Sequence, residues 1–90
     1  MACLLITYDL NTPGQDYKAL HEVIKTLGTS WWHHLDSTWL VAATLTPSQA
    51  WDKIATVADK NDNFLIVNIT GDATQGWLPK DAWEWIRANV

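Results

Sequence analysis

The chain lacks the features of a secreted or membrane-anchored protein. It has a single cysteine, Cys3, so no internal disulfide is expected. It has no apolar run as long as a membrane span, and its first six residues carry neither a basic segment nor a small-residue cleavage site. We therefore expect a cytoplasmic protein without membrane contact, in which Cys3 is a small buried hydrophobe.

Positive charge is also scarce. Six Lys and Arg residues stand against ten Asp and Glu residues, which gives a net charge of −4, and the cations are spread singly along the chain. Proteins that hold duplex nucleic acid neutralise phosphates with Lys and Arg, and their affinity follows the number of such contacts. Stable binding of long duplex nucleic acid is therefore not expected.

Tryptophan, by contrast, is abundant. The chain contains seven Trp among 90 residues, 48% of which are hydrophobic. No repeat or linker divides the sequence, so residues 1–90 are expected to form a single domain. A core of this size cannot easily enclose so many large rings, and some of them are expected to face a partner subunit or a ligand.

The hydrophobic pattern predicts the element order βαββαβ followed by a short helix. Strands are expected at residues 3–8, 30–35, 38–45 and 64–70, and helices at 16–27, from Pro47 onward, and at 79–88. This order closes as a ferredoxin-like antiparallel sheet with two helices on one face, which is an α+β fold.

The helix starts carry capping signals of different clarity. Thr46, followed by Pro47 and Gln49, predicts a capping box for the second helix, whose apolar face includes Trp51. For the first helix, Thr12 and Asp16 are equally good caps.

The two faces of the predicted sheet are both apolar. Side chains alternate along a strand, so one face carries Leu4, Ile6 and Tyr8, and the other carries Cys3, Leu5, Thr7 and Asp9. We expect the second face to include Phe64 and Ile66 as well, which makes it too apolar to be left in water. A second copy of the chain, in a homodimer or higher oligomer, or the terminal helix with Trp83 and Trp85, is expected to cover it.

Two polar residues follow the first strand. Asp9 and Asn11 carry oxygens of the kind that Mg²⁺ binds together with water and substrate phosphate. The alternative is that Asp9 caps the loop after the strand through backbone amides. No other cofactor is expected.

A group of aromatic residues and histidines is the strongest functional signal. Trp31 and Trp32 point to opposite faces of their strand, while Trp39 shares a face with Val41. Such rings stack on nucleobases, but they also serve as core or interface residues, and both roles stay open. His33 is either a phosphate donor or general base, or a structural histidine.

Two further points limit the chemistry. His33 and His34 are neighbours in a strand, so their side chains point to opposite faces and cannot chelate one metal together. Trp77 follows a glycine-containing loop at residues 71–76, which is either a flap beside a ligand or an ordinary connector.

Several segments together resemble a known group of proteins. The run Leu5-Ile6-Thr7-Tyr8-Asp9-Leu10-Asn11, with Ser30-Trp31-Trp32-His33, Asp36-Ser37-Thr38-Trp39 and Trp77, resembles small bacterial and phage proteins described as SinR-like. More distantly, the Tyr8-Asp9 pair at the strand end is similar to the CRISPR-associated adaptation ribonucleases and virulence-associated protein D. The distant resemblance implies that Asp9 meets its twin across a dimer and holds a divalent metal. The closer one implies a protein that sequesters a nucleotide signal in conflicts between phage and bacterial defence.

Three functions follow from these observations. The favoured one is a non-enzymatic homo-oligomeric module that binds a small nucleotide through Asp9, Asn11, Trp31, Trp32, His33, Trp39 and Trp77. The alternatives are a Mg²⁺-dependent endoribonuclease that uses Asp9, and a protein–protein interaction or inhibitor module. The acidic composition and the Trp-rich C-terminal segment favour a binding role over a nuclease.

Overall fold

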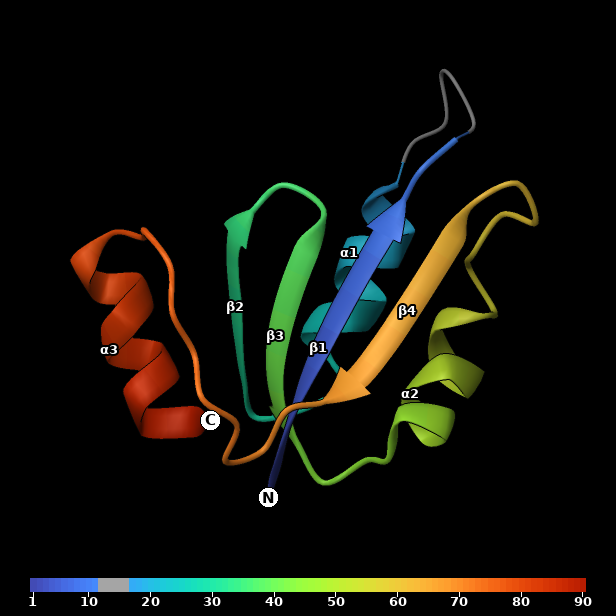
Figure 1. Ribbon diagram of the computed structural model, residues 1–90. Coiled ribbons are helices and arrows are strands. Elements are labelled where there is room, and N and C mark those ends of the chain that lie inside the picture. The colour runs from blue at the N-terminus through green and yellow to red at the C-terminus, as the bar shows by residue number, and fades with distance from the viewer. Residues whose placement is uncertain (12–16) are drawn as a thin grey trace.

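The computed structural model describes residues 1–11 and 17–90, which form a four-stranded antiparallel sheet and three helices (Figure 1). The strands are β1 (Ala2–Asp9), β2 (Ser30–Leu35), β3 (Thr38–Ala43) and β4 (Asn63–Asn68), in the spatial order β2-β3-β1-β4. Both βαβ units are split, because β3 lies between β1 and β2, and β1 lies between β3 and β4. The predicted α+β class and βαββαβ order are confirmed.

The helices lie on both faces of the sheet. Helices α1 (Lys18–Lys25) and α2 (Pro47–Ile54) pack on one face, where their buried residues join those of β1 and β3 in the main core. Helix α3 (Lys80–Asn89) packs on the other face and forms a second, smaller core with Cys3, Trp32 and Leu40. In the described ranges no helix is long and apolar enough to span a membrane.

The pairing register decides which side chains share a face. Because β1 is central and pairs with β3 and β4, its alternate residues Leu4, Ile6 and Tyr8 are buried against α1 and α2. Ile6 lies opposite Ile66, and Tyr8 lies opposite Phe64. Opposed residues of an antiparallel pair point to the same side.

The predicted face of β4 was therefore wrong. Phe64 and Ile66 pack with the main core, and Leu65 and Val67 occupy the second face. The alternation within β4 was predicted correctly, but it cannot tell which set faces the helices until the register with β1 is known.

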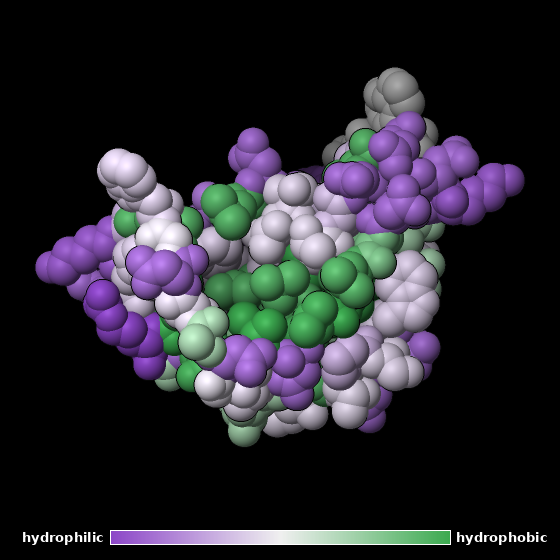
Figure 2. Space-filling model, viewed as in Figure 1, coloured by the Kyte–Doolittle hydropathy of each residue, from purple (hydrophilic) through white to green (hydrophobic). Residues whose placement is uncertain are grey.

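The second face is only partly covered. Helix α3 covers its β2–β3 side, while an apolar area remains exposed at the centre of the view in Figure 2. Leu65 retains 59% of its surface and Val67 retains 38%. The terminal helix, which was expected to cover this face, covers part of it. An oligomer that covers more of the face stays a prediction.

Local signals explain where the helices begin. The Thr46 hydroxyl accepts a hydrogen bond from the Gln49 amide at 3.2 Å, and the Gln49 side chain accepts one from the Thr46 amide at 2.9 Å. The predicted capping box is therefore confirmed. Helix α1 begins at Lys18, and both caps considered for it lie outside the described residues.

Gly28 marks the tightest backbone approach between the end of α1 and the sheet. A Cβ atom at this position would overlap the carbonyl oxygen of Ala42. We expect Gly28→Ala to lower the free energy of unfolding by more than about 2 kcal/mol, because the obstructing atom belongs to the backbone of a central strand. The control is Gly76→Ala, where the nearest atom is 3.9 Å from the new Cβ and the change should stay within about 0.5 kcal/mol. Urea unfolding followed by circular dichroism measures both, and equal stabilities would contradict the packing described at Gly28.

Candidate functional site

An aromatic cluster forms on the α1 side of β2 and β3. It consists of Trp31, His33, Trp39 and His21. The His33 ring stacks on Trp39 with ring centroids 3.7 Å apart and an angle of 15° between the planes. The Trp31 and His21 rings contact Trp39 at centroid distances of 5.3 and 5.5 Å. Three of the predicted ligand residues therefore come together here.

Trp39 is the buried base of this cluster. Its side chain is 1% exposed, and its indole N–H donates a hydrogen bond to the Tyr8 hydroxyl at 2.9 Å. Burial raises the pKa of the Tyr8 phenol, so the hydroxyl that accepts this bond stays neutral. Trp39 is thus a core residue that supports the cluster and is not open to a ligand.

His33 is held from two sides. Its ring lies flat on Trp39, and its Nε2 lies 3.1 Å from the carbonyl oxygen of Asp36. His34 points to the other face, where its ring contacts Trp32 and its Nε2 lies 4.0 Å from the Asp81 carboxylate. The prediction that the two histidines point to opposite faces of the sheet is confirmed.

Trp31 is the exposed ring of the cluster, with 44% of its surface accessible. The Lys25 ammonium lies 5.1 Å from the centre of the Trp31 ring, a cation–π contact. Lys18, His21 and Lys25 follow one another at spacings of three and four residues, so they lie on one face of α1.

The cations were predicted to be spread singly along the chain. The helical spacing of Lys18, His21 and Lys25, with Glu22 among them, was visible in the sequence. What was not visible was that this helix face would lie beside Trp31 and His33 on β2, because that depends on the tertiary packing.

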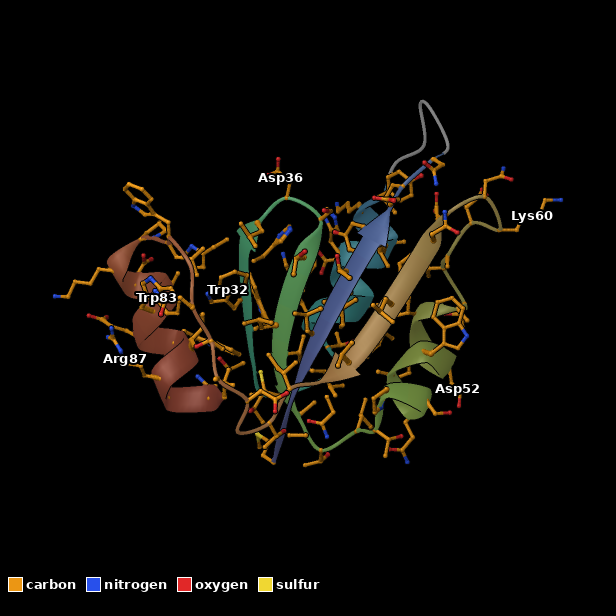
Figure 3. All side chains as sticks on the ribbon, viewed as in Figure 1. Trp32, Asp36, Asp52, Lys60, Trp83 and Arg87 are labelled. Carbon is orange, nitrogen blue, oxygen red and sulfur yellow. The ribbon has the colours of Figure 1, made fainter. Side chains whose placement is uncertain are left out.

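Trp32 lies on the opposite face of the sheet. It points from β2 toward α3 (Figure 3), is buried, and donates a hydrogen bond from its indole N–H to the Ala82 carbonyl at 3.2 Å. The β-strand alternation that places Trp31 at the surface is the same one that places Trp32 in the second core. Trp32 therefore holds α3 and is remote from the aromatic cluster.

Asn11 joins two loops. Its backbone amide donates to the Asp62 carboxylate at 2.8 Å, and its side-chain amide donates to the carbonyl of Asn61 at 3.1 Å. These bonds tie the end of β1 to the turn before β4. They give Asn11 a structural role that does not require a ligand.

Asp9 ends β1 on the same face as Leu65. Its side chain is exposed beside a shallow hollow of about 200 Å³ that Thr7, Asn63 and Leu65 also line. Within residues 1–11 and 17–90, no three His, Cys, Asp or Glu side chains gather as a metal site. The Mg²⁺ role of Asp9 stays a prediction.

Trp77 is fully exposed in the segment between β4 and α3, and it takes no part in the aromatic cluster. The neighbouring loop and α3 form an open hollow of about 330 Å³, lined by Trp83, Arg87, Gly76 and the side chains of Thr74 and Gln75. An indole and a guanidinium at one hollow also suit an aromatic anion. The loop was predicted from the sequence, whereas the place of Arg87 beside it was not.

The aromatic cluster offers an exposed indole with an ammonium over its ring, and two imidazoles. These groups are suited to stacking on an aromatic ring and donating hydrogen bonds to an anion. The surface is open, so a ligand there would be held by stacking and charge rather than by enclosure. No protein-family model, curated protein or solved structure with which the chain was compared matches it.

Proposed function

We propose that the protein is a non-enzymatic, homo-oligomeric binding module that holds a small nucleotide at the aromatic cluster, in the cytoplasm. The observation that carries this proposal is the exposed Trp31 ring with the Lys25 ammonium 5.1 Å from its centre. An aromatic surface and a cation at one place match the two parts of a nucleotide, its base and its phosphate.

Each group of the cluster has a distinct part in this binding. The base stacks on Trp31, whose orientation is supported by the buried Trp39. Lys25 attracts the phosphate, and His33, whose ring stacks on Trp39 and whose Nε2 donates to the Asp36 carbonyl, helps to fix the aromatic surface.

The acidic composition does not oppose this function. A net charge of −4 disfavours long nucleic acids, which need many phosphate contacts. A small ligand needs only a few local donors, and Lys25 provides one at the Trp31 ring. Because the site is exposed, its affinity is expected to fall as the salt concentration rises.

A panel of linear and cyclic nucleotides tests the proposal by thermal shift. At a hundredfold excess over its dissociation constant, a ligand adds about 2.7 kcal/mol to stability, which shifts the melting temperature of so small a domain measurably. Each nucleotide is measured with Mg²⁺ and with a chelator. The proposal predicts a shift that the chelator leaves intact.

Replacing Trp31 with alanine is expected to weaken nucleotide binding roughly 5- to 150-fold, which corresponds to the loss of about 1–3 kcal/mol of base stacking. The matched control is Trp51→Ala, since Trp51 has a similar exposure of 42% but lies on α2. Titration calorimetry measures both affinities. Equal losses in the two variants would contradict a site at Trp31.

Two more variants separate the alternatives. Arg87→Gln is expected to leave binding unchanged; if it alone abolishes binding, the ligand site is the hollow beside Trp83. A shift that requires Mg²⁺ and disappears in Asp9→Ala would favour the metal-dependent ribonuclease. The absence of a shift with every nucleotide would leave a protein partner as the better explanation.

A further inference from the structure

The outer edge of β4 has backbone groups that face away from the sheet. The Ile69 amide donates to the Cys3 carbonyl at 2.9 Å, so residue 69 points its backbone toward β1. Backbone direction alternates along an antiparallel strand, so Leu65 and Val67 also bond to β1. The N–H and C=O groups of Phe64, Ile66 and Asn68 therefore point outward from the sheet.

The sequence of β4 also lacks the charges, proline and bulge that protect many exposed edge strands. Its sequence from Asn63 to Asn68 contains no charge and no proline, and its register with β1 is uninterrupted. Such an edge is prone to pair with another strand.

The opposite edge of the sheet is built differently. Strand β2 has a register irregularity between Trp32 and Leu35, and α3 lies against it, with the Trp85 indole N–H donating to the Ser30 hydroxyl at 2.6 Å. A bulge and a covering helix are two common ways to block edge pairing. Helix α2 packs beside β4 through Trp51 and Phe64, but β4 has no bulge, so its outward backbone groups keep the regular spacing that a partner strand needs.

We propose that two copies of the chain pair antiparallel through β4, around a two-fold axis at Ile66. Opposed residues of an antiparallel pair point to the same face of the sheet, whereas neighbours in one strand point to opposite faces. A two-fold axis between two residues would oppose such neighbours, so the axis must pass through a residue. With Ile66 at the centre, Ile66 bonds to its twin, and Phe64 bonds to the partner's Asn68. These are the three residues whose backbone groups point outward.

The charges at the two ends of β4 favour pairing with a second copy of the chain, centred on Ile66. Centring on Ile66 brings the turn that carries Lys60 to the same end of the pair as the partner's turn that carries Asp72, twice in the dimer. Lys60 is exposed and extends from the turn before β4 (Figure 3), and Asp72 is exposed in the turn after it. The nearby Asp62 and Asp59 carboxylates already accept hydrogen bonds within their own chain, from Asn11 and Asn61.

The pairing also joins the exposed apolar residues of the two copies. Leu65 becomes the cross-strand neighbour of the partner's Val67 on the open face of the sheet, and contacts of this kind stabilise adjacent strands. An unrelated extended peptide would satisfy the same backbone groups, but it would not carry the Lys60–Asp72 match. The inference specifies the interface of the homo-oligomer in the proposed function and rests on that part of it.

Cross-linking tests the register directly. In the paired dimer the two Cα atoms at position 66 are about 5.5 Å apart, which is within the range of a disulfide. Ile66→Cys is expected to form a disulfide-linked dimer under mild oxidation, while the native Cys3 is buried and does not take part. The control, Leu35→Cys on the edge of β2, should remain uncross-linked. Equal cross-linking of both variants, or of neither, would overturn the proposal.

Light scattering separates this interface from others. The native chain is expected at twice its mass of 10.2 kDa. Changing Leu65 and Val67 together to lysine places like charges opposite each other and should give a monomer. The same pair changed to glutamate should also be a monomer, and a mixture of the two variants should restore the dimer. A dimer in either variant alone would contradict the pairing.

A last variant distinguishes edge pairing from packing of the open faces. Leu5→Lys introduces a charge on β1, the strand next to β4, on the open face and not at the outer edge of β4. It should leave the dimer intact, whereas a monomer would contradict edge pairing. Nucleotide binding is measured on the monomer in which Leu65 and Val67 are both changed to lysine, so that loss of the interface is not confused with loss of the ligand site.

Discussion

Replacing Trp39 with alanine is expected to destabilise the protein by about 3–5 kcal/mol, the largest effect of any single truncation in the aromatic cluster. The side chain is 1% exposed and forms the floor on which His33 and Trp31 rest. Its removal leaves a cavity and deprives the Tyr8 hydroxyl of its hydrogen-bond donor. Since small domains are stable by only about 5–15 kcal/mol, much of the chain would be unfolded near physiological temperature.

Two variants make this result specific. Trp39→Phe keeps much of the ring but loses the N–H donor, so its destabilisation should lie between the native protein and Trp39→Ala. Trp31→Ala removes an exposed ring from the same cluster and should cost less than about 1 kcal/mol. Urea unfolding followed by far-ultraviolet circular dichroism measures all three. Similar costs for Trp39→Ala and Trp31→Ala would show that Trp39 is not the buried base of the cluster.

Replacing Ile86 with aspartate is expected to detach α3 while the sheet stays folded. Ile86 belongs to the second core, which shares no residue with the main core, so its loss should unfold one element and not the whole domain. An unpaired carboxylate in that core costs about 3–5 kcal/mol. The expected readout is Cys3, which α3 covers in the native state.

The reactivity of Cys3 reports this detachment. Burial raises the pKa of the Cys3 thiol and keeps it from forming a thiolate, so the native protein should react slowly with a thiol reagent. In Ile86→Asp the reaction is expected to be about a hundredfold faster, because each 1.4 kcal/mol changes the open population tenfold. Ala88→Asp, an exposed position on the same helix, is the control and should react like the native protein. An unreactive Cys3 in Ile86→Asp would contradict the assignment of α3 as its cover.

The sequence predicted the order of the elements because each carries a local signal. The alternation in β2 and the capping box at Thr46 depend only on neighbouring residues, and both were predicted correctly. The face of Phe64 and Ile66 was not, since it depends on the register between β4 and β1. Helical spacing likewise placed Trp51 in the core, but α2 lies over the edge strand β4, and 42% of the Trp51 surface remains exposed.

The candidate site, too, was predictable from the sequence only in part. Trp31 and Trp39 point to the same face of the sheet, yet one is exposed and the other buried, because β2 is an edge strand and β3 is central. Side-chain alternation cannot distinguish the two positions without the strand order. The presence of Lys25 beside Trp31 depends on how α1 crosses the sheet, which no local pattern specifies.

The two proposed surfaces lie at opposite edges of one sheet. The aromatic cluster lies on the β2 side, and the pairing edge is β4, with β3 and β1 between them. A dimer formed through β4 would therefore leave both nucleotide surfaces open and far from its axis. This arrangement predicts two equivalent ligand sites in each dimer, which act independently unless binding changes the sheet itself.

The most direct test of the account is titration calorimetry with the nucleotide that gives the largest thermal shift, carried out on the native protein and on Trp31→Ala in the presence of a chelator. We expect saturable binding of one nucleotide per chain to the native protein, and an affinity reduced roughly 5- to 150-fold in Trp31→Ala. Native-like affinity in Trp31→Ala, with the fold intact, would contradict a nucleotide site at the aromatic cluster.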